Sequence, residues 1–177
     1  MENNSHYLRN KTVYLCGSIH SSSDDGVGWR ETITPQLKKF GLEVLDPCKK
    51  NNKLGIDEIG KDKEKFRNLV LKQNWKKLKK DFWGIVHYDL RCCDKADFII
   101  FNYDTKANMV GSIHELTVAN FEKKPILLLY DKAQLKDFNP WVATFVKAYH
   151  FFSGREALFS YLQNVDKGEF DTSLWVV

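Results

Sequence analysis

Residues 96–120, ADFIIFNYDTKANMVGSIHELTVAN, constrain the fold of this chain more than any other segment. They begin with an apolar run of strand length at 97–103, pass through a short loop and a Gly-Ser turn, and end in a helical pattern at 112–121. A strand that leads through a loop into a helix is typical of open α/β sheets, whose ligands bind at the carboxyl ends of the strands. The segment therefore predicts such a sheet, with Glu115 near its ligand-binding edge.

Strands and helices alternate along the rest of the chain. The expected strands are residues 12–16, 42–45, 97–103, 126–130 and 149–152, and the expected helices are 29–40, 66–90, 112–121, 138–146 and 153–164. Alternation of this kind predicts a three-layer α/β sandwich with a five-stranded parallel sheet of the Rossmann or flavodoxin type. We expect a single domain over residues 1–177, with a helical insert at about 49–88 and a docked C-terminal tail at 166–177.

Two details of the helices follow from local sequence. Ser153 and Glu156 have the spacing of a capping box, which predicts Ser153 as the N-cap of the last helix. The long helical stretch at 66–90 contains Gly84 after Trp83, and we expect it to break there into two helices.

Composition bounds the class of protein. Hydrophobic residues make up 43% of the 177 residues, enough for a real core, and no apolar run reaches the length of a membrane span. The polar N-terminus lacks the apolar stretch of a signal peptide, so we expect a cytoplasmic protein that does not contact a membrane. Cysteines without disulfide or metal-ligand spacing predict reduced thiols, and neither a metal nor another cofactor is expected; the cysteines are Cys16, Cys48, Cys92 and Cys93.

Much of the net charge of +4 comes from residues 72–83, KQNWKKLKKDFW. A basic helix that carries tryptophan can contact nucleic acid. The alternative, which we favour because the charge is so local, is a solvated helix face whose Trp75, Leu78 and Phe82 pack inward at helical spacing.

Glu115 is the leading candidate for chemistry. Gly111 and Ser112 precede it, so backbone N–H groups at the start of this helix favour an ionised carboxylate. An ionised carboxylate at a sheet edge can attack an anomeric carbon and form a covalent glycosyl intermediate. The alternative is an acid in the first helical turn that only complements the helix dipole. His114 is expected to face another side of the helix.

Further candidates lie at the same edge. Asp89 is a second carboxylate that could donate a proton to a departing base or hold that base, or it could simply pair with Arg91 or Lys95. The first strand runs directly into a glycine-containing loop that could wrap a phosphate or a sugar with its backbone N–H groups; the loop begins with Gly17, Ser18, Ile19 and His20. Neither a dinucleotide fingerprint nor a P-loop is present.

Three side chains near this loop have two readings each. His20 is either an anion contact or an exposed loop residue. Trp29 either stacks on a base or packs at the start of a helix, and Arg30 pairs with a phosphate or a carboxylate.

These motifs together resemble the nucleoside 2-deoxyribosyltransferase superfamily. The opening Tyr14-Leu15-Cys16-Gly17-Ser18-Ile19 is similar to that of the branch that hydrolyses deoxynucleoside 5′-monophosphates. The segment from Asp89 to Ile100 resembles the D-L-(x)5-A-D motif of the superfamily, and Gly111–Ala119 resembles its nucleophile helix. The resemblance covers about residues 12–131, and the whole chain also resembles uncharacterised phage and archaeal members.

The resemblance implies cleavage of the N-glycosidic bond of a (2′-deoxy)nucleoside or its 5′-monophosphate, with transfer of the sugar to another base or to water. Glu115 would be the nucleophile, Asp89 would assist the leaving base, and Tyr14 would hold Glu115. The loop at 17–20 would contact the base or the sugar, and the loop that includes Asn108, Gly111 and Ser112 would contact the 5′ end. Members of the superfamily are usually homo-oligomers.

Two departures leave the substrate open. Thr117 replaces the usual glycine, and Met109 stands where transferases carry an acid and the monophosphate hydrolases a serine. Nucleoside and nucleotide therefore both remain possible, as do transfer and hydrolysis. The alternatives from other classes are a non-catalytic nucleotide-binding module and a protein that contacts nucleic acid through residues 72–80.

Overall fold

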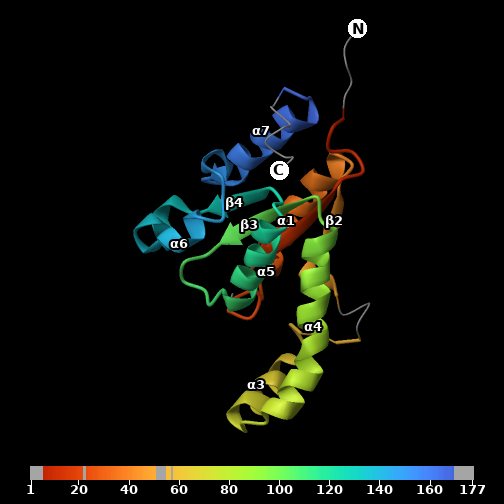
Figure 1. The fold of residues 1–177 in the computed structure, drawn as a ribbon, viewed down its shortest axis with the longest axis vertical. Helices are drawn as coiled ribbons and strands as arrows, with labels where there is room; N and C mark the ends of the chain where they lie inside the picture. Colours follow the sequence, from red (N-terminus) through yellow and green to blue (C-terminus); the bar gives the residue numbers. More distant parts are fainter. Residues whose placement is uncertain (1–5, 22, 51–54, 57, 170–177) are drawn as a thin grey trace.

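The computed structural model describes residues 6–21, 23–50, 55–56 and 58–169. It contains a five-stranded parallel sheet in the order β2-β1-β3-β4-β5. The strands are β1 (Thr12–Gly17), β2 (Glu43–Leu45), β3 (Phe98–Tyr103), β4 (Ile126–Tyr130) and β5 (Phe151–Phe152). This is the flavodoxin-type order, and it confirms the predicted fold class (Figure 1).

Helices connect the strands and cover both faces of the sheet (Figure 1). The α-helices are α1 (Val27–Lys39), α3 (Lys63–Leu71), α4 (Trp75–Lys95), α5 (Val110–Phe121), α6 (Pro140–Ala143) and α7 (Arg155–Asp166). Short 3₁₀ segments lie at Pro47–Lys49, Lys132–Asp137 and Ala148–His150. Within the described ranges, no helix is long and apolar enough to cross a membrane.

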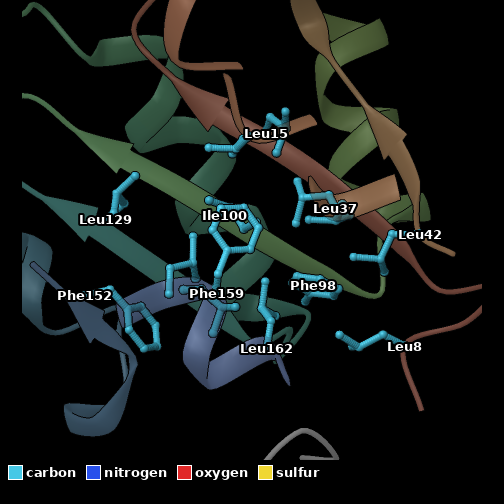
Figure 2. Close-up of a cluster of buried hydrophobic side chains, with 14 of the residues drawn as sticks. Leu8, Leu15, Leu37, Leu42, Phe98, Ile100, Leu129, Phe152, Phe159 and Leu162 are labelled. Carbon is cyan, nitrogen blue, oxygen red and sulfur yellow. The ribbon is translucent and has the colours of Figure 1, made fainter. Parts of the chain in front are cut away.

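Alternation along the strands divides the core into two layers. Leu15 and Ile100 face α1 and α7, where they pack with Leu37, Phe159 and Leu162 (Figure 2). Successive residues of a strand point to opposite faces, so Tyr14 and Cys16 lie in the other layer. That layer also contains Cys93 of α4 and Leu116 of α5. The strand register thus directs two polar side chains of β1 toward the helix that carries Glu115.

The helices α3 and α4 form a hairpin whose far end projects away from the sheet (Figure 1). The predicted break near Trp83 and Gly84 is wrong, because the chain turns instead at Gln73, which has φ 52°, and the Asn74 side chain caps α4. Gly84 is tolerated inside α4 because it lies on an exposed face where an added Cβ would touch nothing.

The packing of this hairpin differs partly from the prediction. Leu78 and Phe82 do pack against a small buried cluster of Phe66, Leu69 and Ile85. Trp75, however, is 57% exposed, so the prediction that it packs inward is wrong. It lies in the first turn of α4, beyond the reach of the cluster.

Helix boundaries differ from the prediction at two sites. Helix α5 begins at Val110 with Met109 as its N-cap, so Glu115 lies in the second turn and the dipole argument for it weakens. Helix α7 begins at Arg155 with Gly154 as its N-cap; Ser153 is not the cap, because the φ of 121° at Gly154 takes the chain into the helix one residue later. Most of the tail expected to dock, residues 170–177, lies outside the described residues.

Candidate active site

A cavity of about 380 Å³ lies beyond the carboxyl ends of β1 and β3. These neighbouring strands lead to connections that run in opposite directions from the sheet, the point where open α/β sheets bind ligands. The loop after β1, the loop after β3, the start of α5 and the middle of α4 enclose it. Its lining comprises Gly17, Ser18, Ile19, His20, Glu58, Phe82, Ile85, Val86, Asp89, Leu90, Asn108, Val110, Gly111, Ser112, His114 and Glu115.

Glu115 reaches this cavity from the flank of α5. The next residue, Leu116, is fully buried against the sheet, so the helix is anchored beside Glu115 and the carboxylate lies where α5 meets β1. The Cys16 thiol donates a hydrogen bond to Glu115 Oε2 at 3.0 Å. Since Cys16 is fully buried on β1, this bond ties the carboxylate to the rigid sheet.

The surroundings of Glu115 disfavour its charge. Burial, followed by the negative charge of Asp89, raises the pKa of Glu115 to about 7, although the Cys16 side chain, the Lys50 charge and the Tyr14 side chain oppose this shift. Burial and the neighbouring Glu115 also raise the pKa of the Cys16 thiol well above its usual value. The thiol is therefore protonated and available as a donor.

Tyr14 lies behind Glu115, within the core and outside the cavity lining. Burial, followed by the charge of Glu115, raises the pKa of this phenol well above its usual value. Its hydroxyl faces Glu115 closely enough to favour the ionised carboxylate, but among the described residues it has no hydrogen-bond partner of good geometry. Tyr14 can position Glu115, but in this structure it does not border the ligand space.

Asp89 is held by a lysine distant in sequence. Lys50 Nζ lies 2.5 Å from Asp89 Oδ2 and 2.5 Å from Glu58 Oε2, and all three side chains are nearly buried. The predicted partners, Arg91 and Lys95, do not take this place. Burial raises the pKa of Asp89 to about 6, although the Lys50 charge and hydrogen bond oppose that shift.

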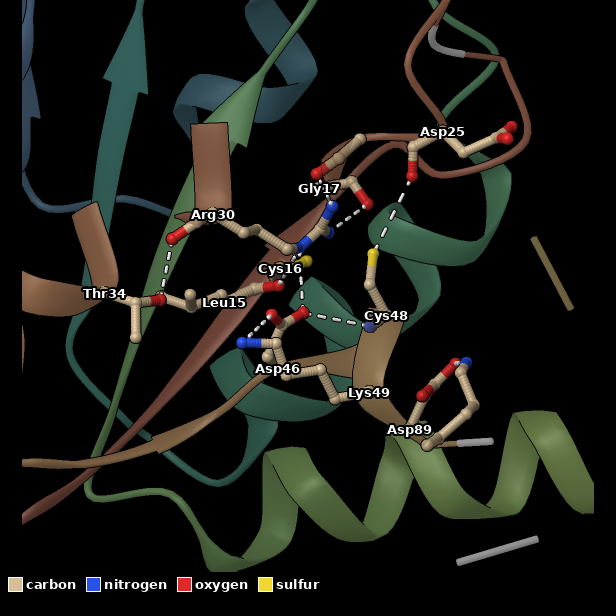
Figure 3. Close-up of polar contacts among 12 residues, drawn as sticks. Leu15, Cys16, Gly17, Asp25, Arg30, Thr34, Asp46, Cys48, Lys49 and Asp89 are labelled. Carbon is tan, nitrogen blue, oxygen red and sulfur yellow. Dashed lines mark hydrogen bonds and ion pairs between the residues drawn. The ribbon is translucent and has the colours of Figure 1, made fainter. Parts of the chain in front are cut away.

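Arg30 is placed differently from its expected contact with a ligand. Its side chain is fully buried and does not line the cavity. It donates to the carbonyl oxygens of Leu15 (3.2 Å) and Gly17 (2.9 Å) (Figure 3) and to that of Gly26 (2.6 Å). Its Nε also lies 3.8 Å from Asp46 Oδ1. The guanidinium therefore fixes the loop after β1 from behind, because the buried carbonyl groups at this strand end need hydrogen-bond donors.

Trp29 also lies outside the cavity lining. Its ring packs against the first core layer and the Arg30 guanidinium, whose carbon lies 4.6 Å from the ring centroid. An added Cβ on Gly17 would lie 3.1 Å from this ring, so the glycine permits the contact. The packing interpretation of Trp29 therefore describes this structure better than stacking on a base.

The remaining predicted residues do meet at the cavity. Gly17, Ser18, Ile19 and His20 border it from β1, and Asn108, Gly111 and Ser112 border it from the start of α5. His20 Nδ1 also lies 3.4 Å from Glu58 Oε1. His114, expected on another side of α5, borders the cavity as well.

Sequence reasoning missed Lys50, Glu58 and the role of Cys16. Lys50 and Glu58 come from a polar stretch without periodicity, which gives no signal of burial. Cys16 carried a usable signal, because residues i and i+2 of a strand share a face and Tyr14 was already a candidate. Among the described residues, no group of His, Cys, Asp and Glu is arranged to hold a metal ion.

Comparisons with known proteins bear on the fold. No known protein family and no curated protein sequence matches this chain. Among solved structures, a 2-deoxyribosyltransferase from Bacillus psychrosaccharolyticus is similar, with a TM-score of 0.56 and 16% identity over 92% of this chain and 93% of that one. A conserved protein from Enterococcus faecalis V583 gives a TM-score of 0.61 and 14% identity over 88% of this chain and 99% of that one. At these identities the likeness shows a shared fold.

The chemistry available at the cavity follows from its two carboxyl groups. The pKa values of the two carboxyl groups, about 7 for Glu115 and about 6 for Asp89, let the pair share one proton near neutral pH. The form competent for displacement is the one in which this proton lies on Asp89 and Glu115 is the ionised nucleophile. Many enzymes that break glycosidic bonds use such a pair, with one carboxylate as nucleophile and the other carboxyl group as acid and base.

Proposed function

We propose that this chain cleaves the N-glycosidic bond of a (2′-deoxy)nucleoside or its 5′-monophosphate through a covalent intermediate on Glu115. The observation that carries the proposal is the position of Glu115, which lies at the cavity wall with one carboxylate oxygen held by Cys16 and a second carboxyl group, Asp89, in the same lining. The shared fold with a 2-deoxyribosyltransferase supports it.

In the first step, a carboxylate oxygen of Glu115 attacks C1′ of the sugar. The C1′–N bond breaks, its electron pair leaves with the base, and Asp89 in its protonated form gives the base a proton. In the second step, a water molecule or a second base attacks C1′, the bond to Glu115 breaks, and ionised Asp89 takes a proton from the attacking group. The two displacements retain the configuration at C1′.

The other residues of the site position these groups. Cys16 holds the Glu115 carboxylate, and Lys50 holds Asp89. In this proposal Tyr14, which lies behind Glu115, also positions the carboxylate. In this proposal the loop at 17–20 contacts the base or the sugar, and the start of α5 contacts the 5′ end. In this proposal the protein acts in the cytoplasm, and it forms a homo-oligomer, as the resemblance of its motifs suggests.

The test is a panel of nucleosides and 5′-monophosphates, with release of free base followed by chromatography. Glu115→Gln and Glu115→Ala are expected to lower base release by roughly 10³-fold or more while circular dichroism stays unchanged. Glu156→Gln, an exposed acid on α7 at the opposite face, is the matched control and should turn over normally. Normal turnover by either Glu115 variant rules out Glu115 as the nucleophile.

A second free base added to the reaction separates transfer from hydrolysis, because transfer yields a new nucleoside. Tight binding of a ligand without base release across the panel would instead favour the non-catalytic module.

The outer face of α4 favours a second candidate function, contact with nucleic acid. Trp75 and Trp83 are 57% and 54% exposed, and the lysines between them, including Lys76, Lys79 and Lys80, are exposed as well. Aromatic rings among lysines can stack on bases next to phosphates. Binding to single-stranded DNA or RNA that weakens with salt and is lost in Trp75→Ala supports this function; absence of binding at low salt rules it out.

A further inference from the structure

A buried lysine lies between two of the acids that line the cavity. Lys50 is 2% exposed, and its ammonium group donates a hydrogen bond to Asp89 Oδ2 at 2.5 Å and forms an ion pair of the same length with Glu58 Oε2. The side chains of Glu58 and Asp89 are themselves only 6% and 10% exposed. Because both carboxyl groups contact one nitrogen, the charge of each acts on the other where water screens it weakly.

The three side chains come from separate elements. Lys50 follows the 3₁₀ segment after β2, Glu58 precedes α3, and Asp89 belongs to α4. Surface ion pairs between long, mobile side chains have little effect, but these three groups are held inside the protein at short distances. The charges of Lys50 and Glu58 therefore act on Asp89 from fixed positions.

The charge of Lys50 requires an anion at every stage of a reaction, because an unpaired ammonium group in the interior is costly. Although burial opposes it, the charges of Asp89 and Glu58 raise the pKa of Lys50 above its usual value, so Lys50 remains a cation. When Asp89 is protonated, Glu58 is still the anion beside Lys50. Without Glu58, Lys50 would depend on an ionised Asp89.

The two oxygens of Asp89 have different surroundings. Oδ2 accepts the hydrogen bond from Lys50, whereas Oδ1 is buried and has no hydrogen-bond partner among the described residues. A proton on Asp89 therefore resides on Oδ1, while Oδ2 keeps its bond to the ammonium group. Asp89 can thus change its protonation state without losing its contact with Lys50.

We propose that Lys50 and Glu58 are positioning residues that decide which of Asp89 and Glu115 holds the proton that the two share. The proposal deepens the proposed function and rests on it. Lys50 favours ionised Asp89, which places the proton on Glu115. Glu58 neutralises Lys50, so the proton can lie on Asp89 and leave Glu115 ionised for attack; the pair carries one proton in either form. After Asp89 gives its proton to the base, Lys50 stabilises the carboxylate that remains.

The other ionisable groups near Asp89 have weaker or unchanging charges. They are Arg30 of α1, Tyr14 of β1, Tyr88 and Cys93 of α4, and the cavity histidines His20 and His114. The phenols and the thiol stay neutral because burial raises their pKa values, and the guanidinium is a permanent cation bound to backbone carbonyl oxygens. The histidines carry charge only when protonated, and His20 Nδ1 lies 3.4 Å from Glu58 Oε1, so both are replaced in the controls.

The first test follows the Asp89 carboxyl group by ¹³C NMR in the protein labelled at its aspartate side chains, without substrate. Loss of the resonance in Asp89→Asn assigns it. Glu58→Gln should lower the pH at which half of Asp89 is protonated by about one unit or more, and Lys50→Met should raise it by about as much. The double variant removes both charges and should titrate close to the native protein. Shifts of one sign in both single variants, or none in either, overturn the proposal.

Control variants remove comparable charges elsewhere. Lys49→Met and Glu64→Gln each remove an exposed charge, one beside Lys50 in sequence and one on α3, and they should leave the Asp89 titration unchanged. Shifts in these controls as large as those of the buried pair contradict the assignment.

Two further comparisons cover the histidines and a failure to fold. The opposite shifts should persist in proteins that also carry His20→Gln or His114→Gln, and their disappearance there would assign the effect to the histidine instead. If Glu58→Gln does not fold, Lys50→Met compared with the double variant still isolates the charge of Glu58. Equal Asp89 titrations in those two proteins contradict its role.

Turnover is the second test. Glu58→Gln should lower kcat/KM for the best substrate about tenfold at the pH optimum, because one unit in the pKa of Asp89 alone changes tenfold the share of the pair with its proton on Asp89. The double variant should recover most of this loss, which a merely structural role would not allow; a double variant less active than Glu58→Gln contradicts the proposal. If the native protein releases no base from any substrate, the proposed function fails, and the NMR titrations then decide the charge argument alone.

Discussion

The hydrogen bond from Cys16 to Glu115 leads to a prediction about pH. Cys16→Ala removes the donor that favours the ionised carboxylate, whose pKa is already about 7 because of burial. A hydrogen bond to a charged group contributes about 1.5–3 kcal/mol, and a thiol is a weak donor, so we take ~1 kcal/mol. That loss raises the pKa of Glu115 by about 0.7 unit, because one unit corresponds to about 1.36 kcal/mol.

The expected result is a shifted acidic limb in the pH profile of kcat/KM. After such a shift, the ionised fraction of Glu115 falls about fivefold at pH 6 and hardly changes above about pH 9, and kcat/KM falls with it. Base release from the best nucleoside, measured from pH 5 to pH 9.5, reports this directly. Cys16→Ser keeps a donor and should keep the limb close to that of the native protein.

Cys93→Ala is the control for lost volume, because Cys93 is fully buried in the same core layer. A merely structural role for Cys16 would lower stability and total activity in both alanine variants without moving the limb. An unmoved limb in Cys16→Ala, or an equal shift in Cys93→Ala, refutes the assignment of Cys16 as a positioning residue.

Three further variants test stability. Folding raises the pKa of Glu115 from 4.5 to about 7, so the native state binds a proton more tightly than the unfolded state and stability falls as pH rises through this window. Glu115→Gln should therefore raise the free energy of unfolding by about 1–3 kcal/mol at pH 8 and by little at pH 4. Urea titrations at the two pH values measure this difference. Equal effects at both pH values would contradict the buried-charge explanation. Gly26→Ala should destabilise by about 1–3 kcal/mol, because Gly26 has φ 71° and an added Cβ would lie 2.1 Å from the Ser18 carbonyl oxygen. Gly84→Ala, inside α4 with open space around the added Cβ, should stabilise by about 0.5–1 kcal/mol, and thermal melts that fail to separate the two variants would argue against this loop geometry.

Much of the fold was predictable because the signals were local. The apolar runs at the cores of β1, β3 and β4 are too short for buried helices, and each is followed by glycine or polar residues, so alternation alone predicts a parallel sheet. The loops that carry Ser18 and Asn108 follow from the same logic, because carboxyl ends of parallel strands meet at one edge.

The parts that escaped prediction depend on contacts between distant residues. Lys50 meets Asp89 across 39 positions of sequence, and no local pattern records which lysine enters the interior. Arg30 illustrates the same difficulty, because an arginine beside a ligand loop can reach the ligand or the backbone behind it, and only the positions of three carbonyl groups decide. Helical spacing predicted that Trp75 packs inward, because periodicity identifies the apolar face of a helix. It does not show where the neighbouring element ends, and Trp75 lies outside the small cluster that Leu78 joins.

A single uninterrupted helix joins the far end of the hairpin to the cavity. Trp75 begins α4 and Asp89 lies fourteen residues further along it, about 21 Å at 1.5 Å per residue. An α-helix behaves as a stiff rod over such a length, so a pivot of the tip about the sheet carries the Asp89 carboxyl group with it. If Asp89 serves the leaving base as proposed, the α3–α4 hairpin is a lever on that acid, and a partner bound at its tip would change the spacing of the two carboxyl groups without entering the cavity.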